Sequence, residues 1–261
     1  MNPFTLEGKV AIITGGGRGI GASIAEVFAE FGASVAVTAR TAADVDEVSA
    51  RIRDAGGAAI GIEADLYDTD QLPRVVDRTI DEFGGVDVVV NNAGAGGSPS
   101  FVDTRVDDLE RAFRLMVSSP FELTRLALPS MLERPGASVV NMTSVGYSRS
   151  GRGNLAHWTA KTALAGLTRL MAADLGPKVR VNAIAPGPVE TPGFRGAIEG
   201  RGPEMRQMVI DTMRLKRMGT PEDVAWAALY LASPASAWIT GIVLDLNGGP
   251  IDEQKARTPD L

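Results

Sequence analysis

The sequence predicts an α/β fold in which a doubly wound sheet of about seven parallel strands carries helices on both faces. Short apolar runs rich in Val, Ile and Ala alternate along the chain with longer segments of helical periodicity. The strand candidates are apolar throughout, which is typical of parallel strands that are buried on both faces. No linker divides the chain and no fixed period repeats, so we expect residues 1–261 to form a single domain.

Strand and helix candidates alternate in the order that such a sheet requires. The expected strands are 9–14 (KVAIIT), 34–39 (SVAVTA), 58–64, 86–93, 137–144, 179–186 and 241–247. The expected helices are 18–31, 42–55, 69–83, one long helix over 106–133, 154–175 (with Asn154 as its N-cap) and 223–233.

Two segments depart from this alternation. Residues 193–217 contain Gly, Arg and Met residues without a strand pattern. Because insertions of this kind often cover a binding site, the segment is a candidate substrate lid, with an ordinary helical excursion as the alternative. The tail 250–261 is polar and is a candidate loose end.

The composition excludes several classes of function. The formal net charge of −6 argues against nucleic acid as a partner, because binding its phosphates requires a basic face. The chain has no cysteine and one histidine, so we expect no disulfide, thiol nucleophile or metal site. No apolar run approaches the ~18 residues of a membrane span, and the N-terminus has no signal-peptide pattern. We therefore expect a cytoplasmic protein without membrane association.

A glycine-rich segment between the first strand and the first helix marks a candidate dinucleotide site. Residues 14–28 are TGGGRGIGASIAEVF, in which Gly17, Gly19 and Ala22 fit the G-x-G-x-x-G/A pattern of Rossmann folds. Glycine permits a sharp turn and lets backbone N–H groups approach a pyrophosphate, while the helix N-terminus adds positive potential. The fold is therefore expected to be a Rossmann-type, dinucleotide-binding sheet.

The end of the second strand bears on the choice of cofactor. Rossmann folds that bind NAD(H) place an acidic residue there, which accepts a hydrogen bond from the ribose 2′-hydroxyl. Here Ala39 and Arg40 occupy the strand end, and Arg40, together with Arg18, is suited to a 2′-phosphate. Asp44 and Asp46 fall within the next helix and are expected to be poor ribose ligands. The sequence thus favours NADP(H) over NAD(H), with a merely solvated Arg40 as the alternative.

Further motifs complete a resemblance to a known family. TGGGRGIG supplies the Thr-Gly-x-x-x-Gly-x-Gly pattern at Thr14, Gly15, Gly19 and Gly21. NNAG follows at 91–94, APGPVET at 185–191, GTPEDVA at 219–225 and ITGIVLDLNGG at 239–249. In this order the motifs resemble the short-chain dehydrogenase/reductase (SDR) family, in its classical branch, over nearly the whole chain.

The resemblance implies an oxidoreductase that interconverts a ketone or aldehyde with an alcohol, and a homotetramer or homodimer. By the same resemblance, Ser144 is the serine that hydrogen-bonds the substrate oxygen, and Lys161 is the lysine that binds the nicotinamide ribose. The residues implied in cofactor binding are Gly15, Gly17, Arg18, Gly19, Ile20, Gly21, Arg40, Asp65, Leu66, Asn92, Ala93, Gly94, Lys161, Pro186, Gly187, Val189 and Thr191.

The sequence departs from the family pattern at two catalytic positions. The family's proton donor is a tyrosine one helical turn before the lysine, and that position holds His157, the sole histidine. The family's asparagine, which supports a proton-relay water, aligns with Met116. Positive charge from the lysine and the nicotinamide would lower the pKa of an imidazole, so His157 is expected to be neutral, as a base that still carries one N–H.

Three interpretations of this site remain open. In the first, which we favour, His157 acts as the acid/base with Ser144 and Lys161 in an NADP(H)-dependent oxidoreductase. In the second, another group such as Tyr147 donates the proton, or the scaffold performs a non-redox reaction. In the third, the site is degenerate and the protein binds nucleotide with little or no turnover.

The substrate is defined only as a carbonyl/alcohol pair. Phe194, Met205 and Met208 would form a soft apolar lid. Arg149 and Arg152 could bind an acidic group, or else are solvated loop residues. The loops expected around the substrate are 93–101, 145–154 and 188–196.

Overall fold

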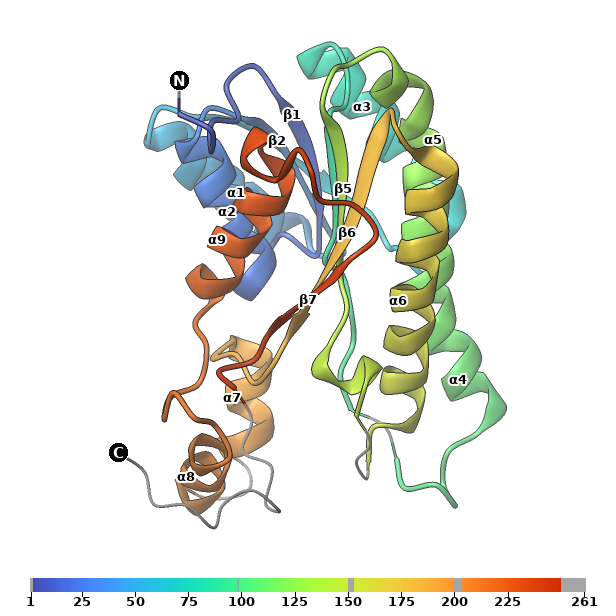
Figure 1. The fold of residues 1–261 in the computed structure, drawn as a ribbon, viewed down its shortest axis with the longest axis vertical. Helices are drawn as coiled ribbons and strands as arrows, with labels where there is room; N and C mark the ends of the chain where they lie inside the picture. The colour runs from blue at the N-terminus through green and yellow to red at the C-terminus, as the bar shows by residue number, and fades with distance from the viewer. Residues whose placement is uncertain (1, 98, 150–152, 200–202, 250–261) are drawn as a thin grey trace.

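Seven parallel strands form one sheet, as the sequence predicts, and their order across the sheet is β3-β2-β1-β4-β5-β6-β7 (Figure 1). The computed structural model describes residues 2–97, 99–149, 153–199 and 203–249. Every strand pairs in parallel with its neighbours, so each connection crosses back over the sheet. The strands are β1 (Val10–Thr14), β2 (Ser34–Ala39), β3 (Ala58–Glu63), β4 (Val88–Asn91), β5 (Ala137–Met142), β6 (Val179–Pro186) and β7 (Val243–Leu246).

The apolar runs are continuous because the central strands are covered on both faces. All residues of β1, β4 and β5 are buried, whereas the outermost strands β3 and β7 retain exposed or partly exposed positions. This difference follows from the topology, since the edge strands have a neighbour on one side only.

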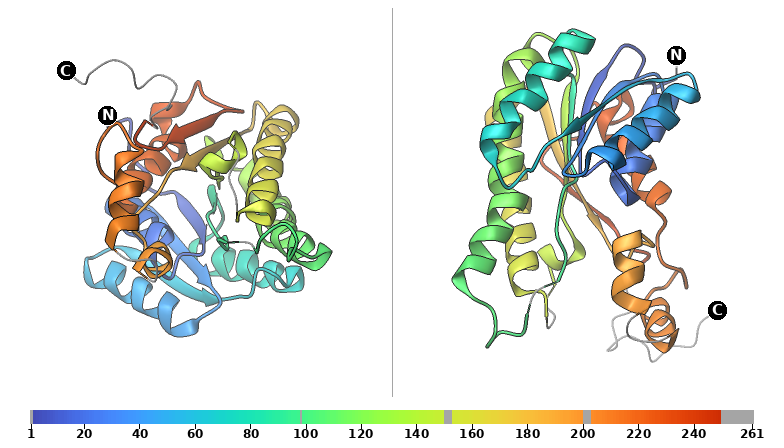
Figure 2. Two further views of the ribbon diagram at one scale, coloured as in Figure 1. Left: turned by 90° about the horizontal axis from the view of Figure 1, so that it is seen from below. Right: turned by 180° about the vertical axis from the view of Figure 1, so that it is seen from behind.

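Two helical layers cover the sheet (Figures 1 and 2). One layer packs on the core cluster that contains Phe28 and Leu229, and the other packs on the cluster that contains Leu123 and Met131. The first layer holds α1 (Gly19–Glu30), α2 (Ala42–Asp54) and α9 (Pro221–Ala232). The second layer holds α3 (Leu72–Phe83), α4 (Val106–Phe113), α5 (Ser119–Leu132) and α6 (Leu155–Leu175). In the described ranges, no helix is long and apolar enough to cross a membrane.

The prediction of one α-helix over 106–133 is wrong in its middle. A π-helical segment, Arg114–Ser118, separates α4 from α5, and its wider turn ends with the Ser119 N–H bonded to the Arg114 carbonyl. Pro120 has no N–H to donate to the carbonyl of Met116, so the α-helical bonding pattern cannot continue there. Such π-turns within helices are frequently found at functional sites.

Two short helices stand beyond the carboxyl ends of the strands. They are α7 (Pro192–Glu199) and α8 (Pro203–Asp211), which occupy the segment expected to form a lid (Figure 1). Ile210, Met213 and Met218 form a small apolar cluster there, against which Phe194 packs. The tail 250–261, expected to be loose, lies outside the described residues.

Candidate active site

The residues expected to bind cofactor and substrate gather beyond the carboxyl ends of the strands. Gly15 follows the end of β1, Asn92 follows β4, Ser144 lies just beyond β5 and Gly187 follows β6. The chain runs outward from β1 to β2 and β3, then returns to β4 on the other side of β1. This reversal is the topological switch point at which open α/β sheets bind ligands.

The glycine-rich loop has the close approaches that only glycine allows. Gly15 and Gly19 adopt positive φ angles of 63° and 57°. A Cβ on Gly21 would lie 2.3 Å from the Gly15 carbonyl oxygen, so α1 packs directly on the loop. The loop therefore leads backbone N–H groups into the start of α1, which is the geometry that binds a pyrophosphate.

Thr14 and Asn92 tie this loop to the end of β4. The Thr14 hydroxyl accepts hydrogen bonds from the N–H groups of Asn92 and Ala93 at 2.9 and 3.0 Å. The Asn92 amide donates to the carbonyls of Thr14 and Gly15 at 2.9 and 3.2 Å. The side chain of Asn92 thus supports the loop, and a cofactor would meet the backbone of the turn that follows.

Other expected cofactor residues divide between exposed side chains and backbone positions. Arg18 and Arg40 are exposed at the loop and at the end of β2. Asp65 is partly buried, and its carboxylate accepts a hydrogen bond from the Tyr67 N–H at 3.1 Å. Ile20 packs against the core and Leu66 is 4% exposed, so contacts from either residue would use its backbone.

The segment after β6 lies against the glycine-rich loop. A Cβ on Gly19 would lie 3.3 Å from Cγ2 of Thr191, and the Thr191 hydroxyl accepts the Phe194 N–H at the start of α7. Gly187 packs on Asn247 so closely that its Cβ would lie 2.9 Å from the Asn247 Cα. Val189 forms an isolated bridge with Gly219. These contacts connect the expected nicotinamide segment, 186–191, to both the loop and the base of the lid.

His157 and Lys161 lie one turn apart on α6 and share one face of the helix. Nδ1 of His157 lies 2.7 Å from the carbonyl oxygen of Ala95. Because a carbonyl can only accept, Nδ1 carries the proton in this contact and Nε2 keeps the lone pair when the ring is neutral. Burial, and then the charge of Lys161, lower the pKa of His157 to about 4, although the bond to Ala95 opposes this shift.

Lys161 is almost completely enclosed. Its Nζ donates to the Met142 carbonyl at 2.5 Å, and burial lowers its pKa to about 8. Nζ of Lys161 and Sδ of Met116 both lie within 4 Å of the position that a Cβ on Gly94 would take, at 3.4 and 3.7 Å. The turn Ala93–Gly94 therefore touches both the lysine and the glycine-rich loop, since Gly15 packs against Ala93.

Ser144 and Tyr147 lie on the loop beyond β5. The Ser144 hydroxyl accepts the Gly146 N–H at 3.3 Å, and the Tyr147 carbonyl accepts a hydrogen bond from the Thr162 hydroxyl. Trp158 packs on this loop and holds it against α6, because a Cβ on Gly146 would lie 2.2 Å from the indole. Of the two loop arginines, Arg149 is exposed and Arg152 lies outside the described residues.

Two backbone carbonyls of this site were not among the residues predicted from the sequence. Ala95 and Met142 bind His157 and Lys161 through main-chain oxygens. No residue type is required for such a contact, so the sequence carries no signal for either. Among the described residues, no group of His, Cys, Asp or Glu is arranged to hold a metal ion.

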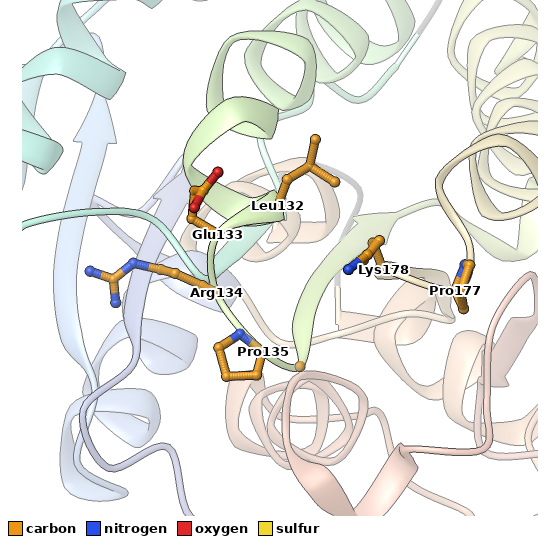
Figure 3. A pocket seen from close by; sticks show the side chains of 7 residues that line it. Leu132, Glu133, Arg134, Pro135, Pro177 and Lys178 are labelled. Carbon is orange, nitrogen blue, oxygen red and sulfur yellow. The ribbon is translucent and has the colours of Figure 1, made fainter.

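Two surface cavities lie away from this face of α6. One, of about 530 Å³, is lined by Gly146, Leu155, Trp158 and Thr162 among others, with the helical residues on another face from Lys161. The other, of about 390 Å³, lies at the amino ends of the strands, where Arg134 and Lys178 come from the loops before β5 and β6 (Figure 3). Neither cavity is lined by His157 or Lys161, so the glycine-rich loop and the residues of α6, rather than cavity volume, locate the candidate site.

Comparisons with known proteins agree with this arrangement. Residues 15–250 match the family model described as enoyl-(acyl carrier protein) reductase. An uncharacterized oxidoreductase of Mycobacterium tuberculosis is 42% identical over 95% of this chain and 94% of its own length. A solved structure of 7α-hydroxysteroid dehydrogenase with NADH and 7-oxo glycochenodeoxycholic acid is 38% identical, with a TM-score of 0.91 over 96% of this chain and 97% of that chain.

A second solved structure that is similar to this chain holds NADP instead of NADH. It is a putative NAD(P)-dependent gluconate 5-dehydrogenase from Beutenbergia cavernae with bound NADP, 33% identical, with a TM-score of 0.88 over 95% of this chain and 98% of that chain. Sequence and structure therefore match dehydrogenases over almost their full length. The chain belongs to the short-chain dehydrogenase/reductase family of oxidoreductases.

Proposed function

We propose that the protein is an NADP(H)-preferring oxidoreductase that interconverts a ketone or aldehyde with an alcohol, with His157 as its acid/base. The observation that carries this proposal is the turn Ala93–Gly94, which touches the glycine-rich loop on one side and Lys161 on the other. A dinucleotide held by the loop would thus bring its nicotinamide end towards the face of α6 that carries His157.

The close-packed glycine-rich loop fits a dinucleotide. Its backbone N–H groups and the N-terminus of α1 would hold the diphosphate. Lys161 would bind the nicotinamide ribose, and the segment 186–191 would hold the carboxamide. When bound, the cofactor supplies or accepts the hydride.

His157 is suited to removing a proton from an alcohol. In oxidation, its Nε2 lone pair would accept the hydroxyl proton while the carbinol carbon loses a hydride, and Ser144 would donate a hydrogen bond to the substrate oxygen. Because the pKa of His157 is lowered to about 4, the ring is in the basic form at neutral pH. Reduction at neutral pH would require a proton from a group that is rarely protonated.

The preference for NADP(H) is supported by Arg40 and Arg18, which are both exposed beside the loop. Arg40→Ala should raise the Kd for NADPH about tenfold or more, because a charge-assisted pair with the phosphate is lost, and should change the Kd for NADH much less. Arg169→Ala, at an exposed position of α6, is the matched control. Equal loss for both dinucleotides would contradict this cofactor preference.

The exposed apolar residues of the segment that contains α7 and α8 favour a bulky, largely apolar substrate. Met208 is 61% exposed and Leu215 is 66% exposed, so this part of the chain presents apolar surface at the carboxyl edge of the sheet. We propose that the segment is the substrate lid. The related hydroxysteroid dehydrogenase was solved with a steroid, which is consistent with a substrate of this class.

The proposed homotetramer or homodimer is supported by exposed apolar side chains. Phe121 is 46% exposed, Leu170 is 67% exposed and Trp238 is completely exposed. Covering such residues with another copy would remove apolar surface from water. Analytical ultracentrifugation at micromolar concentration would detect these oligomers. The cytoplasmic location stays a prediction.

One observation favours a second function. Sδ of Met116 and Nζ of Lys161 both lie within 4 Å of the position of a Cβ on Gly94, and a thioether offers only a weak hydrogen-bond acceptor there. A site that has lost its polar relay could bind nucleotide with little turnover or carry out a non-redox reaction. Tight dinucleotide binding without substrate-dependent oxidation across a panel of alcohols and ketones would support this alternative.

The catalytic role of His157 is tested by replacing it. His157→Ala should lower kcat/KM about 100-fold or more, because a positioned general base is removed. Thr159→Ala, at an exposed position of the same helix, is the matched control and should leave kcat/KM nearly unchanged. Wild-type activity in His157→Ala would exclude His157 as the acid/base, and activity created only by His157→Tyr would show that the native site is dormant.

A further inference from the structure

The loop that carries Ser144 is attached to α6 through Trp158. Gly146 lies in the short 3-10 turn Val145–Tyr147 that follows Ser144. A Cβ on Gly146 would stand 2.2 Å from both Cγ and Cδ1 of Trp158 and 2.4 Å from its Cδ2. The five-membered ring of the indole therefore covers Gly146 directly, and no side chain larger than hydrogen fits between them.

Gly146 is required here for space and not for backbone conformation. Unlike Gly15 and Gly19, it does not adopt a positive φ angle, so its conformation is open to residues that have a side chain. Trp158 is partly buried and follows His157 on α6. The smallest residue on the loop and the largest side chain on the helix thus form a complementary pair. A contact that is packed this closely leaves the loop little freedom to shift.

A second connection between the loop and α6 is weaker. The Thr162 hydroxyl donates to the Tyr147 carbonyl at 3.3 Å and to the Trp158 carbonyl, one turn earlier in the helix, at 2.8 Å. A hydroxyl has a single proton, so the shorter bond within the helix takes the larger share of it. The contact between Trp158 and Gly146 is therefore the main restraint on the loop from the side of α6.

The backbone of Gly146 reaches back to Ser144. Its N–H donates to the Ser144 hydroxyl oxygen at 3.3 Å, which is long for a hydrogen bond. Because the hydroxyl uses a lone pair in this bond, its proton is left for a different acceptor. A small movement of Gly146 away from Ser144 would break the bond and allow the hydroxyl to rotate among its staggered positions.

We propose that Trp158 is a positioning residue for the oxidoreductase reaction. By covering Gly146, it holds the Gly146 N–H on the hydroxyl oxygen of Ser144 and so directs the Ser144 proton to the substrate oxygen. In this role Trp158 acts through the loop and needs no contact with the substrate. This inference rests on the proposed function, in which Ser144 donates a hydrogen bond to that oxygen.

A purely structural role for Trp158 has different consequences. If the indole only stabilised α6, its loss would disturb all that this helix carries, including Lys161, and would weaken dinucleotide binding. If Trp158 acts through Ser144, its loss slows the chemical step, because a hydrogen-bond donor to the substrate oxygen is misplaced. Dinucleotide binding then stays in place, since the glycine-rich loop and Lys161 are unchanged.

The experiment compares Trp158→Ala and Trp158→Phe with Thr159→Ala, at the exposed neighbouring position of α6. The substrate is the secondary alcohol of the panel that wild type oxidises fastest with NADP+. We expect Trp158→Ala to lower kcat about tenfold or more and to keep the Kd for NADPH within about twofold of wild type. Trp158→Phe retains an aromatic ring over Gly146 and should keep most of the activity, and Thr159→Ala should behave as wild type.

Two measurements without ligands report on the same contact. The Gly146 amide should exchange its hydrogen with water about tenfold faster in Trp158→Ala than in wild type, because its bond to Ser144 is lost. Gly146→Ala should lower the melting temperature of wild type but not that of Trp158→Ala, because the new methyl group then occupies space that the indole has left. Such a dependence of one substitution on the other is expected only for residues in contact.

Three outcomes overturn the inference. It fails if Trp158→Ala keeps kcat within about twofold of wild type while Ser144→Ala lowers it about tenfold or more. It fails if Trp158→Ala weakens NADPH binding as much as it lowers kcat, or if Thr159→Ala has the same effect as Trp158→Ala. Thermal melts verify folding, and Trp158→Leu is a second variant that removes the ring.

A different pair of results would contradict the proposed function instead. These results are wild-type activity in Ser144→Ala, and a wild-type protein that oxidises no alcohol of the panel.

Discussion

His157 should remain neutral until the pH falls to about 4, well below the ordinary value near 6.5. The perturbation is a pH titration of the folded protein without ligands. With a pKa of 4, about one molecule in a thousand carries a protonated ring at pH 7, against about one in four for an unperturbed histidine. The structure therefore predicts a base that is fully available at neutral pH.

Burial is the largest cause of this shift, and the charge of Lys161 comes second. Lys161→Met removes the charge and keeps an apolar side chain of similar length in the enclosed site. The pKa of His157 should then rise but stay below 6.5, because the imidazolium would still lose its water on burial. The hydrogen bond to the Ala95 carbonyl favours the charged ring and opposes the lowering of the pKa of His157.

The assay is NMR of protein labelled with 15N and 13C at histidine. Because the chain contains a single histidine, its ring gives one set of signals without further assignment. The titration should show a midpoint near 4. Above that midpoint the proton should reside on Nδ1, which bonds to Ala95. A midpoint above 6, or a proton on Nε2 in the neutral ring, would refute the reasoning about this site.

Three further predictions concern stability. As the pH falls from 6.5 to about 4, the unfolded chain binds a proton at His157 that the folded chain does not bind. The free energy of unfolding of wild type should therefore fall by up to about 1.4 kcal/mol per pH unit over this range. In urea titrations, His157→Gln should lack this contribution to the pH dependence. Asp87 is 2% exposed and forms ion pairs with both Lys9 and Arg134. Asp87→Asn should therefore lower the free energy of unfolding by about 2–3 kcal/mol, and a decrease below about 0.5 kcal/mol would contradict a stabilising role. Gly146→Ala should lower the melting temperature because the new Cβ meets Trp158 at 2.2 Å, whereas Gly166→Ala, with nothing within 4 Å, should not.

The strands were predictable because burial on both faces leaves a simple sequence signal. The predicted strands 34–39 and 179–186 match β2 and β6 at both ends. The break between α4 and α5 was missed because apolar residues remain in helical register through Arg114–Ser118. Pro120 was the available signal, but a proline near the start of a helix and one within it look alike in sequence.

The site was predictable where side-chain identity carries the chemistry. The glycines of the loop and Lys161 were assigned from motifs, and the structure brings both against the turn Ala93–Gly94. The carbonyls of Ala95 and Met142 were not predictable, because any residue supplies one. The packing of Asp44 against Gly17 was not predictable, because it depends on how α2 packs on the loop, which no local pattern records.

Burial is the largest cause of the lowered pKa values of both His157 and Lys161. Burial disfavours the charged form of each, and in His157 the charge of Lys161 adds to this effect. At neutral pH the pair therefore carries the charge of the lysine, and a second positive charge on the imidazole would be opposed by both burial and repulsion. Under the proposed role, the neutral imidazole of His157 would accept the hydroxyl proton in alcohol oxidation, because the base begins that direction without a proton on Nε2. A reductase working at pH 7 would need its proton from another donor, and the chain offers Tyr147 on the adjoining loop.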